Sequence, residues 1–170
     1  MIRRARQADF ATLQEIERAA GRAFATIGMT AIADDEPFTR EELREYERDG
    51  NAWVFAADGR VVAYELVKWV DGVLHIEQVS VHPDHSGRGL GAALIEHLTQ
   101  AYDTPALTLT TFTDVPWNAP YYERLGFRRL SPAEETPGLR EIRSIEAAHG
   151  LDAWPRVCMR RDLAGVSHPA

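Results

Sequence analysis

Alternating apolar and polar positions predict a series of strands in the middle of the chain. Three runs rich in β-branched and aromatic residues follow one another: AWVFAAD (52–58), RVVAYELVKWV (60–70) and VLHIEQVSV (73–81). Asp58-Gly59 separates the first two runs and Asp71-Gly72 the last two. An Asp-Gly pair between such runs is typical of a tight hairpin turn. The pattern therefore predicts three successive antiparallel strands.

Helical periodicity accounts for much of the remaining sequence. A helix is expected from Asp9, its N-cap, to about Phe24, and Thr39 followed by Glu42 has the capping-box pattern of a helix that ends near Gly50. The segment between them, TIGMTAIADDEP, is expected to be a loop. The other expected elements are a strand at IRRAR, a helix from the glycine-rich stretch to about Tyr102, a strand LTLTTF, a short helix in PWNAPYYERLGF, a strand FRRL, a helix over about 137–149 and a last strand around WPRVCMRRDL.

This order of elements predicts the fold class. It is typical of a mixed α/β sheet with an antiparallel first half, in a single domain over residues 1–170. The strand before the glycines, the helix after them and the next strand should form a right-handed parallel crossover.

The most informative stretch chemically is HPDHSGRGLGAAL, residues 82–94. Gly87, Gly89 and Gly91 alternate where a strand ends and a helix begins. A helix N-terminus leaves N–H groups unpaired, and a glycine-rich loop lets an anion approach them closely. The alternative is a tight turn that uses glycine only for positive φ. Three alternating glycines with Arg88 among them favour a phosphate-binding loop.

Two well-known phosphate loops are excluded by spacing. A P-loop ends in Gly-Lys-Ser/Thr, whereas Ala92 and Ala93 follow Gly91 here. The dinucleotide fingerprint needs G-x-G-x-x-G, and GRGLG has a different last interval. The carboxylate expected at the end of the next strand is also missing, because Thr111 and Phe112 stand there.

Two motifs resemble those of the GNAT superfamily of acyl-CoA-dependent N-acetyltransferases. The family signature Gln/Arg-x-x-Gly-x-Gly/Ala is similar to the window Ser86-Gly87-Arg88-Gly89-Leu90-Gly91, which matches both glycines and departs at Ser86. The family's Asn, aromatic pair and Glu-x-Leu-Gly-Phe motif resembles Asn118-Ala119-Pro120-Tyr121-Tyr122-Glu123-Arg124-Leu125-Gly126-Phe127. Here Pro120 and the short spacing from Asn118 to Tyr122 depart from the pattern. The resemblance extends over roughly residues 2–131.

The resemblance implies a fold, a reaction and two catalytic residues. The GNAT-like fold is a mostly antiparallel central sheet, splayed at the acetyl-CoA site, with helices on both faces. The implied enzyme moves an acetyl group from acetyl-CoA to a primary amine by direct attack in a ternary complex. Tyr122 holds the position of the acid that protonates the leaving thiolate, and Glu77 is a candidate base, with His75 and Asp114 as alternatives. The rival hypothesis is a catalytically idle CoA-binding or ligand-sensing module on the same fold.

The resemblance also implies the residues that contact acetyl-CoA. They are Val79, Val81, Ser86, Gly87, Arg88, Gly89, Leu90, Gly91, Ala92, Asn118, Tyr121 and Arg124. Val79 and Val81 would offer backbone groups to the pantetheine arm. Strand alternation predicts that the side chains of Val79 and Val81 point into the core, with Gln78 and Ser80 on the opposite face.

Composition narrows the choice of partners. The net charge of −7 argues against a nucleic-acid-binding protein. No run approaches the roughly 20 apolar residues of a membrane span, so we expect a cytoplasmic protein without a membrane partner. The resemblance to the GNAT superfamily implies that the acceptor is a small-molecule or peptide amine, selected mainly by residues 24–38 and the segment after Ser131. The acidic run Asp34-Asp35-Glu36 either attracts a cationic amine or is simply solvated. An exposed edge strand is compatible with a homodimer.

The remaining candidate groups have simpler interpretations. His82 and His85 are interpreted as surface histidines, and no metal is expected, because no third ligand has matching spacing. Cys158 lies in an apparent strand, where a buried thiol is favoured over a nucleophile.

Overall fold

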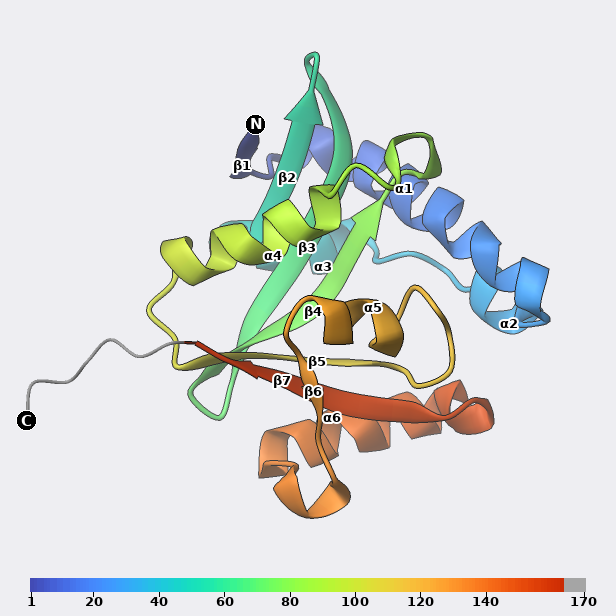
Figure 1. Cartoon of the computed structure of the whole chain (residues 1–170). Helices are drawn as coiled ribbons and strands as arrows, with labels where there is room; N and C mark the ends of the chain where they lie inside the picture. Colours follow the sequence, from blue (N-terminus) through green and yellow to red (C-terminus); the bar gives the residue numbers. More distant parts are fainter. Residues whose placement is uncertain (164–170) are drawn as a thin grey trace, which may run out of the picture. The chain divides into compact units, whose positions relative to one another are not determined.

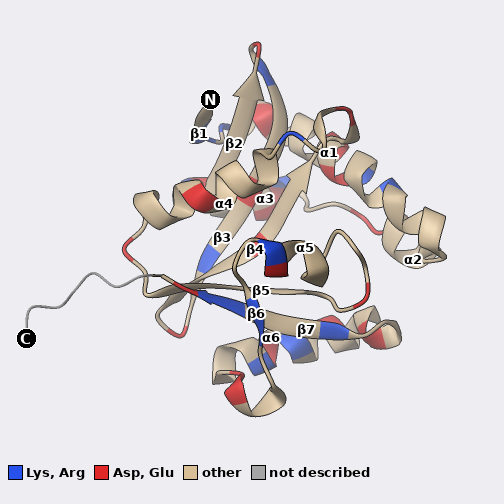
Figure 2. Ribbon diagram, in the orientation of Figure 1, with Lys and Arg blue, Asp and Glu red and all other residues tan. Residues whose placement is uncertain are grey.

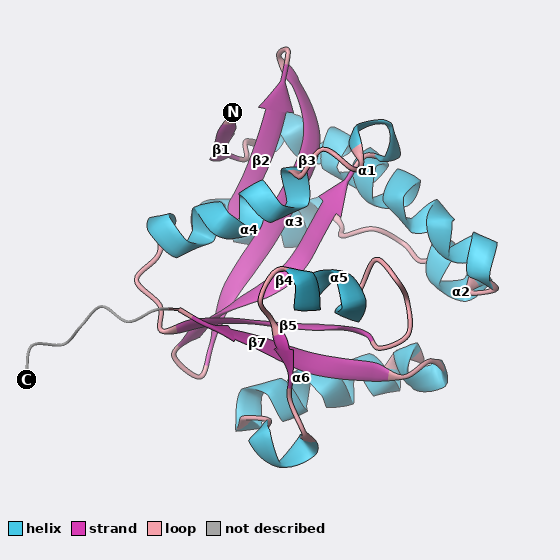
Figure 3. Cartoon of the chain, viewed as in Figure 1, coloured by secondary structure: helices cyan, strands magenta, loops and turns pink. Residues whose placement is uncertain are grey.

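The structure is a computed structural model that describes residues 1–163 (Figure 1). Its strands are β1 (Ile2–Arg4), β2 (Ala52–Ala57), β3 (Arg60–Val70), β4 (Val73–Val81), β5 (Ala106–Phe112), β6 (Arg128–Arg129) and β7 (Arg156–Asp162). Its α-helices are α1 (Phe10–Gly21), α2 (Thr30–Ala33), α3 (Arg40–Arg48), α4 (Leu90–Ala101), α5 (Ala119–Arg124) and α6 (Pro137–Ala148). Figure 3 shows this mixture of helices and strands, which confirms the predicted α/β class.

Within the described residues, seven strands form one mixed sheet in the order β1-β2-β3-β4-β5-β7-β6. β1 and β2 are antiparallel, as are β2 and β3, whereas β4 and β5 are parallel in the register Leu74 to Leu107. The predicted parallel crossover after the glycine stretch is therefore confirmed in direction. Contacts group the described residues into two compact units, one of Met1–Lys68 with Glu77–Ala101 and one of Trp69–Ile76 with residues 102–163. The single domain over residues 1–170 stays a prediction.

Both predicted hairpin turns are present. Asp58 and Gly59 join β2 to β3 with φ of 51° and 76°, and Asp71 and Gly72 join β3 to β4 with φ of 52° and 77°. Positive φ at both central residues is the requirement of a type I′ turn, whose twist matches that of paired strands. Asp tolerates this left-handed conformation better than most residues, and Gly adopts it freely, which is why these dipeptides end the strands.

The core of the first unit lies between one face of its strands and the helices α1 and α3. α1 contributes Phe10, Leu13 and Ile16, and α3 contributes Leu43. Their partners on the sheet are Ala52, Val54, Tyr64 and Leu66. The opposite face of β2 carries Trp53, whose ring meets the His97 ring of α4 at 4.5 Å. Helices therefore cover both faces of the sheet in this unit.

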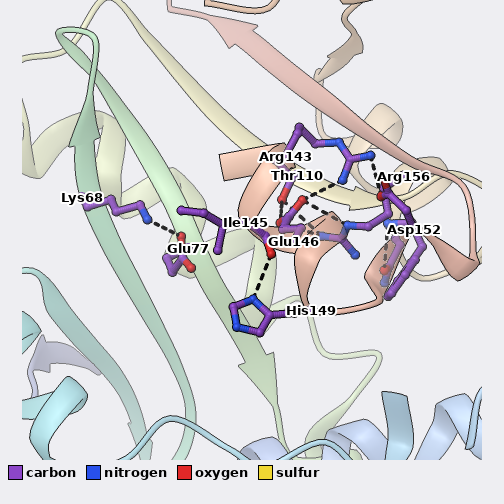
Figure 4. Close-up of polar contacts among 11 residues, drawn as sticks. Lys68, Glu77, Thr110, Arg143, Ile145, Glu146, His149, Asp152 and Arg156 are labelled. Atoms are coloured by element: carbon purple, nitrogen blue, oxygen red, sulfur yellow. Dashed lines mark hydrogen bonds and ion pairs between the residues drawn. The ribbon is translucent and has the colours of Figure 1, made fainter. Parts of the chain in front are cut away.

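In the second unit, α6 is tied to β5 and β7 by a charged cluster (Figure 4). Glu146 of α6 accepts hydrogen bonds from the Thr110 hydroxyl at 2.5 Å, from Arg143 at 3.0 Å and from Arg156 at 3.1 Å. The Arg156 guanidinium also lies 4.3 Å from the Phe112 ring centroid. Although burial alone would raise the pKa of Glu146, the arginines and Thr110 hold it below its ordinary value. The paired charges fix the end of α6 on the sheet.

The predicted loop at residues 26–37 is wrong in part, because the segment contains helical turns. A 3₁₀ stretch spans Arg22–Ile27, and α2 follows it. Met29 is buried, and its carbonyl accepts the N–H groups of Ile32 and Ala33 at 3.0 Å. The segment therefore forms helical turns beside a buried apolar side chain, although its sequence has no helical periodicity. α1 also ends at Gly21, short of Phe24.

Of the two predicted N-cap side chains, Thr39 caps its helix and Asp9 does not. The Thr39 hydroxyl accepts the Glu42 N–H at 3.1 Å, which confirms Thr39 as the N-cap of α3. Asp9 does precede α1, but its carboxylate accepts the Arg6 N–H at 2.8 Å and pairs with Arg3. Asp9 therefore caps the preceding 3₁₀ turn instead of α1.

Basic residues gather on β6 and β7 (Figure 2). Arg128 pairs with Glu134 at 2.7 Å, Arg129 with Glu123 at 3.0 Å, and Arg160 with Asp162 at 2.8 Å. Exposed pairs of this kind contribute little to stability. In the described part of the chain, no helix has both the length and the apolarity to span a membrane.

Candidate functional site

The glycine loop connects β4 to α4 through an exposed segment. Ser86, Gly87, Arg88 and Gly89 are all exposed, and α4 begins at Leu90. Gly87 and Gly89 have φ of 76° and 75°, and a Cβ added at either would meet no protein atom within 4 Å. The glycines are therefore required by backbone conformation and not by crowding. Left-handed residues at alternate positions turn successive N–H groups toward one side, which is the geometry of an anion-binding nest.

Short contacts within the loop hold its shape. The Ser86 hydroxyl donates to the Pro83 carbonyl at 2.9 Å, and the Asp84 N–H donates to Nδ1 of His82 at 3.1 Å. A guanidinium nitrogen of Arg88 lies 3.4 Å from Nδ1 of His85. Both histidines, His82 and His85, therefore contact other residues of the loop. At the position where the family signature has Gln or Arg, the Ser86 side chain is hydrogen-bonded within the loop.

Glu77 lies on β4 next to the only lysine in the sequence (Figure 4). Its carboxylate is 3.0 Å from Nζ of Lys68 on β3. Glu77 also raises the pKa of Tyr46 on α3, after burial, which is the larger cause. The Glu77 side chain therefore lies on the sheet face that α3 covers. The structure brings together Glu77, Lys68 and Tyr46, of which the sequence singled out only the first as a candidate.

The predicted orientation of the end of β4 is wrong. Ser80 is buried at 6% exposure, whereas Val79 and Val81 are half-buried. The Gln78 amide donates to the Ser80 hydroxyl at 2.7 Å, and Ser80 in turn hydrogen-bonds to the buried Tyr64. Because Ser80 has these polar partners, it can occupy the interior face that alternation assigned to valine. The backbone role predicted for Val79 and Val81 is not affected by this change.

Tyr122 lies in α5, on the second of the two motifs. Its ring packs edge-on against Tyr121 at 5.3 Å and Phe127 at 5.9 Å, and its carbonyl accepts the Phe127 N–H at 3.1 Å. Burial, followed by the charge of Tyr121, raises the pKa of Tyr122. The Tyr122 phenol is therefore protonated at neutral pH and can act only as a proton donor there. Its catalytic role stays a prediction.

The other residues of this motif shape the turn into α5. Oδ1 of Asn118 accepts the Phe112 N–H at 3.4 Å, and the Asn118 N–H donates to the Val115 carbonyl at 2.9 Å. The Arg124 guanidinium is exposed and lies 5.7 Å from the Tyr121 ring centroid. Asn118 therefore ties the end of β5 to the start of α5, and the CoA contacts predicted for these residues stay predictions.

The alternative candidates for the base, His75 and Asp114, and the candidate nucleophile, Cys158, lie in very different environments. His75 is buried at 1% exposure, and its Nδ1 is 2.9 Å from the Thr108 hydroxyl, so this ring is sealed inside the second unit. Asp114 is exposed. Cys158 is fully buried, and burial raises the pKa of its thiol to about 12, with the nearby Glu135 contributing. The interpretation of Cys158 as a buried thiol is confirmed.

Known proteins are similar to this chain in sequence. Residues 12–127 match the sequence model of the acetyltransferase (GNAT) family. Over 73 residues the chain is 41% identical to a mycothiol acetyltransferase of Frankia casuarinae; the match covers 42% of this chain and 21% of that protein. The chain thus spans only a small part of the length of this curated relative.

Solved structures with low sequence identity share the fold. The PaiA N-acetyltransferase of Thermoplasma acidophilum, in complex with coenzyme A, superposes with a TM-score of 0.69 at 14% identity, over 96% of this chain and 98% of that chain. The ribosomal-protein-S18-alanine N-acetyltransferase of Escherichia coli gives a TM-score of 0.65 at 18% identity, over 100% and 99%.

Proposed function

Because this chain belongs to the acetyltransferase (GNAT) family, we propose that it is an acetyl-CoA-dependent acyltransferase that acetylates a primary amine by direct attack in a ternary complex. The observation that carries the proposal is the glycine loop, where Gly87 and Gly89 hold the left-handed conformation in front of the α4 N-terminus. Exposed N–H groups at a helix start suit an anion such as the diphosphate of acetyl-CoA.

We propose that both backbone and side-chain groups contact acetyl-CoA. The backbone of residues 86–92 holds the diphosphate, and Arg88 adds a positive charge beside it. The backbone groups of Val79 and Val81 pair with the amides of the pantetheine arm, as an added strand would. The other proposed contacts are Asn118, Tyr121 and Arg124.

Acyl transfer then has three chemical requirements. An amine with a pKa of about 10.4 must lose a proton, which costs roughly 4–5 kcal/mol at pH 7. We assign this task to Glu77, directly or through water. The oxyanion of the tetrahedral intermediate needs a donor, for which we propose the Val79 N–H. The departing thiolate needs a proton, and Tyr122, protonated at neutral pH, is the proposed donor.

Binding of the diphosphate can be tested without knowing the acceptor. Coenzyme A at about 100 times its Kd should stabilise the protein by about 2.7 kcal/mol in thermal unfolding. Pantetheine, which lacks the diphosphate, should stabilise it much less at the same concentration. Equal stabilisation by the two compounds would contradict the proposal.

A matched pair of variants separates loss of binding from backbone strain. Gly89→Ala and Gly59→Ala both place a Cβ on a residue with φ near 75°, and neither Cβ meets a protein atom within 4 Å. The two variants should therefore lose similar stability. Only Gly89→Ala should also lose stabilisation by coenzyme A, because only Gly89 lies in the proposed diphosphate-binding loop. If both variants keep the full response, the loop does not hold the diphosphate.

Turnover is tested with three classes of amine: short diamines, α-amino acids, and peptides with free N-termini. Release of the coenzyme A thiol measures the reaction, and mass spectrometry of the acceptor identifies the product. Tyr122→Phe should lower kcat while leaving stabilisation by coenzyme A unchanged. No thiol release with any class would favour the idle binding module over the enzyme.

A further inference from the structure

A directional chain of hydrogen bonds runs through the interior of the first unit to Glu17 on α1. Tyr64 on β3 is 1% exposed, and its hydroxyl donates to Oε1 of Glu17 at 2.6 Å. Burial, followed by the charge of Glu17, raises the pKa of Tyr64 well above its ordinary value, so the phenol keeps its proton. Tyr64 is therefore a permanent donor, and Glu17 is its acceptor.

The other end of the chain lies on β4. The Gln78 amide donates to the Ser80 oxygen at 2.7 Å, and the Ser80 hydroxyl hydrogen-bonds to Tyr64. Each hydroxyl has a single proton to donate. Once Gln78 donates to Ser80 and Tyr64 donates to Glu17, Ser80 must donate to Tyr64. The direction is set by the carboxylate, which only accepts.

The second oxygen of Glu17 fixes another part of the chain. Oε2 accepts the Phe38 N–H at 3.1 Å, and the Phe38 carbonyl accepts the Gln14 side chain at 3.0 Å. Gln14 and Glu17 are on the same helix and hold the segment that leads into α3. The Phe38 ring meets the Tyr46 ring edge-on at 6.1 Å. One carboxylate therefore restrains both this segment and, through Tyr64 and Ser80, the end of β4.

The restrained part of β4 is the part that the proposed reaction uses. Gln78 and Ser80 flank Val79, and β4 ends at Val81, one residue before the glycine loop begins. A shift of the Val79 N–H by a fraction of an ångström would weaken its hydrogen bond to a developing oxyanion. We propose that Glu17 is a positioning residue for acetyl transfer: it fixes the end of β4 through Tyr64 and Ser80. This inference rests on the function proposed above.

Protonation of Glu17 should release this restraint. Burial raises the pKa of Glu17, and the charges of Asp35 and Glu42, which face it, raise it further, against its hydrogen bonds from Tyr64 and Phe38. A protonated carboxyl has one oxygen that donates, so it no longer accepts well from both partners. Turnover should therefore decline on the acid side as Glu17 takes up its proton.

The test compares Glu17→Gln, Tyr64→Phe and the double variant, with Glu15→Gln as the control. Glu15 is exposed on the same helix. The substrate is the amine of the three-class panel with the highest kcat/KM. Each single variant should lose roughly tenfold in kcat, the scale of one hydrogen bond to a charged group. The double variant should lose no more than the worse single variant, because both act through one chain.

Two further measurements distinguish positioning from a general loss of structure. The acid-side decline of kcat attributable to Glu17 should disappear in Glu17→Gln and persist in Glu15→Gln. Amide hydrogen exchange should speed up at residues 78–81 in both Glu17→Gln and Tyr64→Phe. Additive losses, an unchanged pH profile or unchanged exchange at 78–81 would overturn the inference while the acetyltransferase function stands. If the wild-type protein turns over no amine, the proposed function fails, and the inference fails with it.

Discussion

Glu65 provides a quantitative test of how the first unit is stabilised. It lies on β3 opposite Trp53 of β2, on the face that α4 covers, and its exposure is 0%. Neither carboxylate oxygen has a hydrogen-bond partner in the described part of the chain, and the same is true of Nδ1 of His97 on α4. Burial therefore raises the pKa of Glu65 well above its ordinary value of 4.5.

The sign of the pH effect follows from proton binding. Above pH 4.5 the unfolded chain has released this proton, while the folded protein keeps it until the raised pKa is passed. Within that window stability falls as pH rises, by about 1.4 kcal/mol per pH unit. Over two pH units the loss is about 2.7 kcal/mol, or roughly 5–10 °C in Tm for a protein of this size.

Glu65→Gln removes the titration and keeps the shape of the side chain. Its buried amide has a cost of its own, but that cost does not change with pH. Urea unfolding at pH 5.5, 6.5 and 7.5 should therefore show the variant gaining stability relative to wild type as pH rises, by up to about 1.4 kcal/mol per pH unit below the raised pKa of Glu65. The control Glu15→Gln, at an exposed position of α1, should follow the wild-type pH dependence. Parallel pH dependences for Glu65→Gln and wild type would refute the reasoning.

Three other substitutions or modifications test separate parts of the fold. Thr39→Ala removes the acceptor of the Glu42 N–H and should cost about 1 kcal/mol in urea unfolding, whereas Thr39→Ser should cost little. Glu146→Gln leaves Arg156 without its charge partner and should cost about 3 kcal/mol at pH 7. Because the pKa of Glu146 is lowered, this difference should shrink as pH falls below the ordinary carboxyl value; a constant difference would contradict the ion pair. Cys158 should resist alkylation in the native protein and react fully in denaturant, and rapid native labelling would contradict its burial.

Local sequence was sufficient wherever a backbone conformation depends on neighbouring residues. The Asp-Gly turns between β2, β3 and β4 were predicted because their central residues need positive φ, which Gly and Asp adopt more easily than other residues. The Thr39 cap was predicted because its hydroxyl reaches a partner only three residues away. The glycine loop belongs to the same class, since Gly87 and Gly89 adopt a left-handed conformation that glycine reaches freely.

Tertiary structure decided which side chains meet and which face of a strand is buried. Alternation along β4 assigned Val79 to the core, but Ser80 is buried because Tyr64 and Gln78 satisfy its hydroxyl. Tyr64 reaches Glu17 from 47 positions away in the chain, and no periodicity records such a pairing. The spacing of apolar residues along a helix or strand indicates how regularly its side chains reach the core. Long-range polar contacts depend instead on the packing of elements that are distant in sequence. For that reason the acetyltransferase motifs were readable from the sequence, and the hydrogen-bonded chain behind them required the folded protein.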